Sequence, residues 1–369
     1  MPRIVGLIVN PVAGMGGSVA LKGTDGAAVL ARARELGARP RSGEHMFRAL
    51  KSALPLPEDT SFLAPAGAMG EDVLRRLGLP ARVVCRTEEH TTAADTRAAA
   101  AAICDAGAGL LMFAGGDGTA RDVCAILGES LPVIGVPAGV KIQSSAFAVT
   151  PERAGELLSR WCAGIARETA EAEVVDLDED AYRAGIVTSR LYGTVRVPLD
   201  RLRMQGRKGG SAGGGDASGL GAWLAHEMQP GRLYLIGAGT TTRAVTDALG
   251  LRGTLLGVDA VKDGKLIAAD CAEADLLRLI EPGSTTAVVA VIGGQGHFLG
   301  RGSQQFSPAV LRALGTENIV VAATPAKLDA LFPRPLRVDT GDPELDAKLC
   351  GYVRVVTGWG QSRMMRVER

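Results

Sequence analysis

The chain has few of the residues that build metal clusters, disulfide frameworks and stacking surfaces. Its 369 residues include 6 cysteines and 4 histidines, and aromatic side chains make up only 4%. The cysteines are scattered without a C-x-x-C pair, so we expect neither a structural zinc site nor disulfides, and a reducing cytoplasm fits. With so few aromatics, stacking on nucleic-acid bases is not expected.

An excess of charge of one sign and long apolar runs are missing too. The 41 basic and 40 acidic residues leave a net charge of +1, which gives no general affinity for nucleic acids or membrane surfaces. The apolar run at residues 4–9 is too short for a secretory signal, and no run approaches the roughly 20 residues that span a bilayer. We therefore expect a cytoplasmic protein with no nucleic-acid or membrane partner.

The apolar content of 46% is enough for a sizeable core. Up to about Thr150, short apolar runs alternate with helical segments, which predicts an α/β domain at residues 1–150 with a three-layer, doubly wound parallel sheet. Beyond that point strand-like patterns dominate, and we expect a strand-rich domain at 151–305. A C-terminal section at 306–369 follows.

The most informative stretch runs from Gly109 to Val123 and contains the pentapeptide GGDGT. An apolar run of strand length ends at Gly115 and Gly116, and a segment with one apolar helical face follows Thr119. Asp117 therefore lies in a glycine turn at the carboxyl end of a strand, where open α/β sheets bind ligands and a helix N-terminus favours phosphate. The alternative is that Asp117 only caps the helix.

Three further turns rich in glycine and hydroxyl groups follow predicted strands. Each one suits the close approach of a phosphate or a ribose to the backbone. For Lys141 a solvated surface position is an equal alternative. The candidate ligand-binding residues in these turns are Asn10, Gly14, Gly16, Gly17, Lys22, Thr24 and Asp25; Gly139, Lys141 and Ser144; and Gly239, Thr240 and Thr241.

Residues 205–221 form a stretch so rich in glycine and serine that we expect no buried core there. We interpret it as a mobile loop. Arg207 and Lys208 would let it act as a lid over an anion, whereas the alternative is a surface excursion without a role.

The GGDGT pentapeptide resembles the signature shared by NAD kinases, diacylglycerol and sphingosine kinases, and phosphofructokinases. Two more segments narrow the resemblance, GLIVNPVAGMGGSVALKGTDG at residues 6–26 and IGGQGHFLGRGSQQF at residues 292–306. Together they resemble the ATP-NAD kinase family, in the branch that includes the acetoin-catabolism X proteins. The resemblance covers nearly the whole chain. It implies an NAD kinase-like fold in which the C-terminal section returns to the first domain.

The resemblance also implies a reaction. ATP or polyphosphate, with Mg²⁺, would phosphorylate the 2′-hydroxyl group of NAD to give NADP, and the enzyme would be a homodimer or homotetramer. Asp117 would contact the acceptor ribose as the base, while Gly115, Gly116, Gly118 and Thr119 would meet the nucleotide. The turn at Gly239–Thr241 resembles the family's Thr-Gly-Ser-Thr element only loosely, because the proline and tyrosine of that element are missing.

Two other functions fit the same residues. A kinase for lipids such as diacylglycerol, or for another small hydroxyl compound, shares the pentapeptide and the Asn-Pro that precedes the first glycine turn. A regulator that binds NAD(P) without turning it over is also compatible with the acetoin-linked branch.

Overall fold

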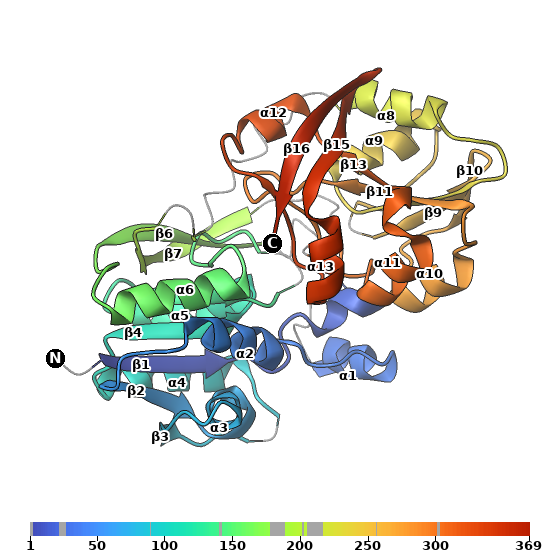
Figure 1. The fold of residues 1–369 in the computed structure, drawn as a ribbon. Helices are drawn as coiled ribbons and strands as arrows, with labels where there is room; N and C mark the ends of the chain where they lie inside the picture. Colours follow the sequence, from blue (N-terminus) through green and yellow to red (C-terminus); the bar gives the residue numbers. More distant parts are fainter. Residues whose placement is uncertain are drawn as a thin grey trace. The chain divides into compact units, whose positions relative to one another are not determined.

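The computed structural model describes residues 3–21, 27–88, 90–139, 142–177, 189–200, 203–204, 217–255, 257–300 and 303–369. The chain divides into two compact units. The first takes residues 1–15 and 39–208, and the second takes residues 16–38 and 209–369. Figure 1 shows the helices and strands, coloured along the chain.

The first unit is built on a sheet of five parallel strands in the order β3-β2-β1-β4-β5. All six residues of β4 are buried, as expected for a parallel strand covered on both faces. The bounds are β1 (Arg3–Val9), β2 (Thr60–Pro65), β3 (Ala81–Cys85), β4 (Leu110–Gly115) and β5 (Val133–Pro137).

Helices cover both faces of this sheet, with α2, α3 and α6 on one side and α4 and α5 on the other (Figure 1). In α6, a Cβ at Gly155 would lie 1.9 Å from the carbonyl oxygen of Ala49, so this glycine permits the close packing of α6 on α2. The predicted three-layer, doubly wound architecture is confirmed. The bounds are α2 (Ser42–Ala53), η2 (Gly67–Met69), α3 (Glu71–Arg76), α4 (Ala93–Asp105), α5 (Asp117–Leu127) and α6 (Pro151–Cys162).

An antiparallel pair, β6 (Thr169–Leu177) and β7 (Ser189–Pro198), completes the first unit. The pair packs on α5, and Val174 and Val195, each 1% exposed, belong to the core of the five-stranded sheet. The division between the units therefore falls at residue 208 rather than near Thr150. The cause is that α6, β6 and β7 bury their apolar sides in the first core.

The second unit has a sheet of nine strands in the order β10-β9-β8-β11-β13-β15-β16-β14-β12. Strands β8, β11, β13 and β15 run parallel, and β16 returns antiparallel to β15. The section at 306–369 thus extends the sheet that the preceding residues begin, and its return to the first unit stays a prediction. The bounds are β8 (Leu233–Ile236), β9 (Asp259–Lys262), β10 (Lys265–Ala268), β11 (Thr285–Ala290), β12 (His297–Leu299), β13 (Ile319–Ala322), β14 (Leu336–Val338), β15 (Gly351–Gly358) and β16 (Gln361–Glu368).

Two cores lie on the two faces of this second sheet. Helices α8 and α9 pack on one face, and α10, α11 and α13 bury leucines in the core of the other. Residues 218–221 form the first turn of α8, and Leu220 is 1% exposed. For residues 218–221 this corrects the expectation of a stretch without a buried core, because Leu220 lies on the helical face that meets the sheet. Arg207 and Lys208 lie outside the described residues.

The helix η1 (Met15–Val19) begins one residue before the second unit does. The helices that lie wholly in this unit are α1 (Ala27–Glu35), α8 (Ser218–His226), α9 (Thr240–Ala248), α10 (Glu273–Leu279), α11 (Pro308–Leu314), η4 (Thr316–Asn318), α12 (Pro325–Asp329) and α13 (Pro343–Leu349).

Candidate active site

The carboxyl ends of β1 and β4 lie side by side in the first sheet, where Val9 is paired with Ala114. The next helix of this unit after β1 is α2 and the next after β4 is α5, and these two helices lie on opposite faces (Figure 1). Ligands of open α/β sheets bind where neighbouring strands send their connections to opposite faces. Asn10 follows β1 and Asp117 follows β4, so two segments far apart in sequence meet at this point.

Asn10 is held through both its backbone and its side chain. Its Nδ2 donates to Oγ1 of Thr119 at 2.9 Å, and its Oδ1 accepts from the backbone N–H of Val12 at 3.2 Å. Its carbonyl oxygen accepts a 2.6 Å hydrogen bond from the Ser42 hydroxyl at the start of α2. The end of β1 is thereby tied to both α2 and α5.

Asp117 is the first residue of α5 and is only 6% exposed. Its Oδ2 accepts from the backbone N–H of Gln143 at 2.7 Å, and its Oδ1 accepts from the backbone N–H and the hydroxyl of Ser144 at 3.0 and 2.6 Å. An ionised carboxylate has about four lone-pair positions. Within the described part of the chain, three donors meet this carboxylate, which leaves a position on Oδ2.

The helix-capping interpretation of Asp117 is wrong. The N-cap residue of α5 is Gly116, without a side-chain cap, and the Asp117 carboxylate instead accepts from residues 143 and 144. The carboxylate therefore joins the start of α5 to the segment that follows β5.

Burial raises the pKa of Asp117 from 3.8 to about 6. The hydrogen bonds from Ser144 and Gln143 lower the pKa, and the negative charge of Asp176 adds to the rise. Asp176 is itself paired with Arg121, with 3.0 Å between Oδ2 and Nη1. A carboxylate with a pKa near 6 is a better base than an ordinary aspartate and is still ionised at neutral pH.

Glycines let the backbone at the ends of β1, β4 and β5 come very close together. At Gly14, where φ is +76°, a Cβ would lie 2.0 Å from the carbonyl oxygen of Ala138. A Cβ at Gly139 would lie 2.6 Å from Cα of Gly116. Side chains are therefore excluded at these contacts. The N–H groups in the first turn of α5 have no acceptor within their own helix, as phosphate-binding helix N-termini require.

The first unit thus brings together half of the predicted site residues. Lys22, Thr24, Asp25 and Lys141 lie outside the described residues. The residues that meet at the ends of β1, β4 and β5 are Asn10, Gly14, Gly115, Gly116, Asp117, Gly118, Thr119, Gly139 and Ser144.

The other predicted glycines belong to the second unit. Gly16 and Gly17 lie in η1, where a Cβ at Gly17 would lie 1.8 Å from Oε1 of Gln304. Gly239 is the N-cap residue of α9, at the carboxyl end of β8, and Thr240 and Thr241 open the helix. A nucleotide-binding role for these residues stays a prediction.

Sequence reasoning missed one residue beside the turn at Gly239–Thr241. The Nζ of Lys327 donates a 2.7 Å hydrogen bond to Oγ1 of Thr241, which is 1% exposed. Lys327 lies in α12, directly after β13, so it stands at the same edge of the sheet as Gly239. The signal is present in the sequence, because the apolar run at residues 319–323 ends just before this lysine.

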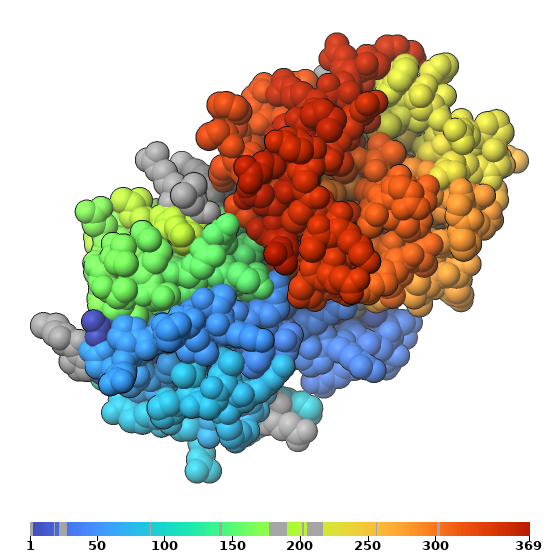
Figure 2. Space-filling view, in the orientation of Figure 1, coloured from blue at the N-terminus to red at the C-terminus, as the bar shows by residue number. Residues whose placement is uncertain are grey.

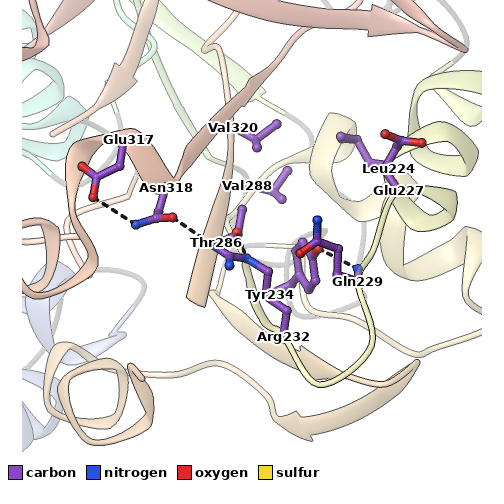
Figure 3. Close-up of a pocket in the computed structure, with 10 residues that line it drawn as sticks. All are labelled: Leu224, Glu227, Gln229, Arg232, Tyr234, Thr286, Val288, Glu317, Asn318 and Val320. Carbon is purple, nitrogen blue, oxygen red and sulfur yellow. Dashed lines mark hydrogen bonds between the residues drawn. The ribbon is translucent and has the colours of Figure 1, made fainter. Parts of the chain in front are cut away.

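A pocket of about 360 Å³ lies in the second unit, near the amino ends of β8, β11 and β13 (Figure 3). Arg232 lies at its base and donates to Oγ1 of Thr286 at 2.7 Å and to Oδ1 of Asn318 at 2.8 Å. It also donates to the carbonyl oxygens of Gly283 and Thr285. These hydrogen bonds are all to the protein itself, so the guanidinium has a structural role. No predicted site residue lines this pocket.

Two family models match this chain. The model described as the ATP-NAD kinase N-terminal domain matches residues 5–165, and the model for the ATP-NAD kinase C-terminal domain matches residues 231–367. The chain belongs to the ATP-NAD kinase family. This membership makes it a kinase of that family, and the GGDGT turn lies inside the N-terminal match.

One solved structure similar to this family member is described as "a putative diacylglycerol kinase from Bacillus anthracis str. Sterne". The two are 15% identical, the TM-score is 0.23, and the match covers 48% of this chain and 46% of that one. The chain thus spans about half the length of that protein. No curated protein matches.

Two further findings concern membrane-spanning helices and metal-binding side chains. Among the described residues, no helix combines the length and apolar character needed to cross a membrane. In that same part of the chain, no three His, Cys, Asp or Glu side chains are grouped so that they could hold a metal ion.

Proposed function

We propose that this kinase transfers the terminal phosphoryl group of ATP to the 2′-hydroxyl group of the adenosine ribose of NAD, giving NADP. The observation that supports the proposal is the state of Asp117, a carboxylate at the ligand-binding edge of the sheet with a pKa of about 6 and an open lone-pair position on Oδ2. Such a group can orient a sugar hydroxyl and take up its proton near neutral pH.

In the proposed reaction, Asp117 accepts the hydroxyl proton as the ribose oxygen bonds to the γ-phosphorus. The bond from that phosphorus to the bridging oxygen breaks, and ADP leaves. Phosphoryl transfer asks the protein mainly for positioning and charge stabilisation. The first-turn N–H groups of α5 would meet the phosphates, while Gly14, Gly116 and Gly139 keep side chains away from them.

The residues present fit magnesium that arrives with the nucleotide. Mg²⁺ usually keeps several waters and binds through one or two carboxylates together with substrate phosphates. Because the open position on Oδ2 of Asp117 is assigned to the ribose hydroxyl, substrate phosphates and waters would hold the ion. When bound, the ion would neutralise charge on the phosphates.

A second candidate function is favoured by the burial of Asp117. Because the carboxylate is 6% exposed and three donors hold it, it also suits a purely structural role in a protein that binds NAD(P) without turnover. Titration calorimetry with NAD, run beside a kinase assay, separates the two. Binding without product would favour the regulator.

The test compares Asp117→Asn with Asp122→Asn. Asp122 lies on the same helix, is 7% exposed and pairs with Arg97 at 2.7 Å, so it is a matched buried carboxylate. NADP formed from ATP, Mg²⁺ and NAD is measured by chromatography, with diacylglycerol in detergent as the competing acceptor. We expect Asp117→Asn to lower kcat by roughly a thousandfold or more, and Asp122→Asn to change it less than about tenfold.

Two results would contradict this proposal. Wild-type turnover in Asp117→Asn would remove the base from the mechanism. Phosphorylation of diacylglycerol in preference to NAD would assign the chain to the lipid kinases.

A further inference from the structure

The hydroxyl of Ser144 lies between the carboxylate of Asp117 and the edge of β6, and the residue is fully buried. Its Oγ lies 2.6 Å from Oδ1 of Asp117 and 2.8 Å from the carbonyl oxygen of Val175, and it accepts from the backbone N–H of Val175 at 3.1 Å. The next residue, Ser145, donates its backbone N–H to the carbonyl oxygen of Glu173 at 2.9 Å. The segment that follows β5 is therefore bonded along the edge of β6.

The hydroxyl has one proton and two acceptors within reach. A serine Oγ–H can donate only once, and its lone pairs accept. A hydroxyl bound to an ionised carboxylate lies about 2.5–2.7 Å from it, and this bond is roughly twice as strong as one between neutral groups. The 2.6 Å distance to Asp117 lies in that range. The N–H of Val175 occupies a lone pair of Oγ and so helps to aim the proton at the carboxylate.

The β6–β7 pair is irregular at the same place. The pairing shifts by one residue between Val174 and Val175, which leaves Tyr192 as an extra residue on β7. Bulges of this kind redirect side chains and are frequent beside active sites. The ring of Tyr192 lies 5.3 Å from the guanidinium carbon of Arg121, which also pairs with Asp176 at 3.0 Å. The β6–β7 pair is thus fixed to α5 at a second point, one helical turn after the carboxylate.

We propose that Ser144 is the positioning residue of the Asp117 base. By donating its one proton to Oδ1, the hydroxyl holds Oδ2 towards the acceptor and keeps the carboxylate ionised at the pH of catalysis. The inference rests on the proposed function, in which Asp117 takes up the proton of the ribose hydroxyl. Ser144, a candidate nucleotide-binding residue in the sequence, would then act through Asp117 and not through a contact with the nucleotide.

The balance of influences on the carboxylate supports this role. Burial raises the pKa of Asp117 most. The hydroxyl of Ser144 comes first among the influences that lower it, ahead of the backbone N–H groups of Ser144 and Gln143. A hydrogen bond to the charged form of a group favours that form. Loss of the hydroxyl should therefore raise the pKa of Asp117 above its present value of about 6.

The titratable side chains on the elements around Asp117 are themselves held within the first unit. In the described part of that unit they are Asp176 on β6 with Arg121 on α5, Asp122 on α5 with Arg97 on α4, and His45 on α2 with the carbonyl oxygen of Pro137. The charge of Asp176 adds to the rise in the pKa of Asp117. Lys141 lies outside the described residues.

Ser144→Ala removes the hydroxyl and keeps the backbone contacts. The N–H groups of Gln143 and Ser144 still reach Asp117, and that of Ser145 still reaches β6. Figure 2 shows the part of the chain that contains α6 and β6 (green) at the surface of the first unit, and Val175 is partly exposed. The backbone groups that lose the hydroxyl thus belong to a strand near the surface, so we expect the variant to fold.

The pH dependence of kcat/KM for NADP formation is the first test, because it reports the ionisation of essential groups in the free enzyme. In Ser144→Ala the acid limb should move up by at least about one pH unit, with kcat/KM returning to within about tenfold of the wild type at high pH. Ser52→Ala is the matched control. The Ser52 hydroxyl lies between the carbonyl oxygens of Ala49 and Glu152, at 2.9 and 3.0 Å, and its loss should leave the profile in place.

Urea unfolding gives a second readout that needs no turnover. The stability of the chain with Asp117 is compared with that of Asp117→Asn across the pH range, once with Ser144 present and once in Ser144→Ala. The difference should level off above about pH 6 in the first pair, where the folded carboxylate is ionised. In the second pair it should level off at least about one pH unit higher.

Circular dichroism checks that the variants fold. If the alanine variant does not, Ser144→Cys keeps a weaker donor of similar size and should move both curves in the same direction by less. A loss of kcat/KM that is equal at every pH, with unmoved unfolding curves, would make Ser144 a purely structural residue and overturn the proposal while Asp117 keeps its role. A wild type that forms no NADP would instead contradict the proposed function, and the unfolding curves would still show whether Ser144 keeps Asp117 ionised.

Discussion

The Nδ2 atom of Asn10 donates a 2.9 Å hydrogen bond to Oγ1 of Thr119, a residue 109 positions farther along the chain. The bond joins the carboxyl end of β1 to the first turn of α5. It therefore fixes the two loops between which the sheet binds its ligand. Since phosphoryl transfer depends on positioning, this contact should matter more for activity than for stability.

Asn10→Ala and Thr119→Val test that expectation in a double-mutant cycle. Each single change should lower the free energy of unfolding by about 1 kcal/mol, as for an ordinary hydrogen bond. Each should lower kcat/KM by roughly 10-fold to 100-fold, because small misplacements of a site cost that much. Urea unfolding and initial rates give the two readouts. The double variant should lose little more activity than either single one, and fully additive losses would show that the residues act separately.

The raised pKa of Asp117 predicts a pH dependence of stability. Because burial raises the pKa from 3.8 to about 6, the folded chain binds this proton more tightly than the unfolded chain. The stabilisation that comes from this tighter proton binding is fully present below the pKa of Asp117 in the unfolded chain. It is lost as the pH rises through the pKa of Asp117 in the folded chain. Relative to Asp117→Asn, the wild type should lose about 3 kcal/mol as the pH rises from about 3 to about 7.

Urea unfolding of both proteins across this pH range measures the difference, and other titrating groups cancel because the two chains share them. A wild type that gains stability over Asp117→Asn as the pH rises would show that the folded carboxylate has a lowered pKa instead. The hydrogen bonds from Gln143 and Ser144 would then outweigh its burial.

The sequence predicted the single elements of the first unit and their parallel, doubly wound sheet, but not the order of the strands within it. The apolar run before Gly115 predicts a buried strand, and β4 is buried throughout. The adjacency of β1 and β4 is a long-range property that no local pattern contains. The donors to Asp117 could not be predicted either, because two of them are backbone N–H groups, those of Gln143 and Ser144, which any residue type except proline supplies.

The C-terminal hairpin was missed for a different reason. In β15 and β16, Arg354 and Arg366 alternate with apolar residues, and much of one face of both strands is exposed. They therefore lack the continuous apolar run that predicts a buried strand. The alternation that marks a half-exposed strand is further blurred by exposed Tyr352 and Met364, which count as apolar although they face outward.

Gly139→Ala tests the close backbone contact at the ends of β4 and β5. A Cβ there would lie 2.6 Å from Cα of Gly116, so one of the two segments must shift. We expect a loss of roughly 1–3 kcal/mol in the free energy of unfolding, with lower activity. Gly109→Ala is the control, since its Cβ would lie 3.8 Å from the nearest atom, the carbonyl oxygen of Ile4.

The control should stay within about 0.5 kcal/mol of the wild type. Thermal and urea unfolding measure both variants. A Gly139→Ala protein as stable and active as Gly109→Ala would mean that the backbone contact yields easily, and the turn would then not be a rigid part of the site.

Lys327 gives the prediction for the second unit. Its Nζ lies 2.7 Å from Oγ1 of Thr241 in the first turn of α9, where a positive charge and the helix N-terminus both favour an anionic group. If the turn at Gly239 binds a phosphate of the substrate, Lys327→Met should raise the KM for that substrate roughly tenfold with kcat nearly unchanged. This is the pattern expected when the lost interaction is equally strong in the ground state and the transition state. Lys348→Met is the control, because Lys348 is exposed and pairs with Glu344 on α13. Initial rates at varied NAD and at varied ATP show which substrate is affected, and unchanged KM values for both would remove this turn from the site.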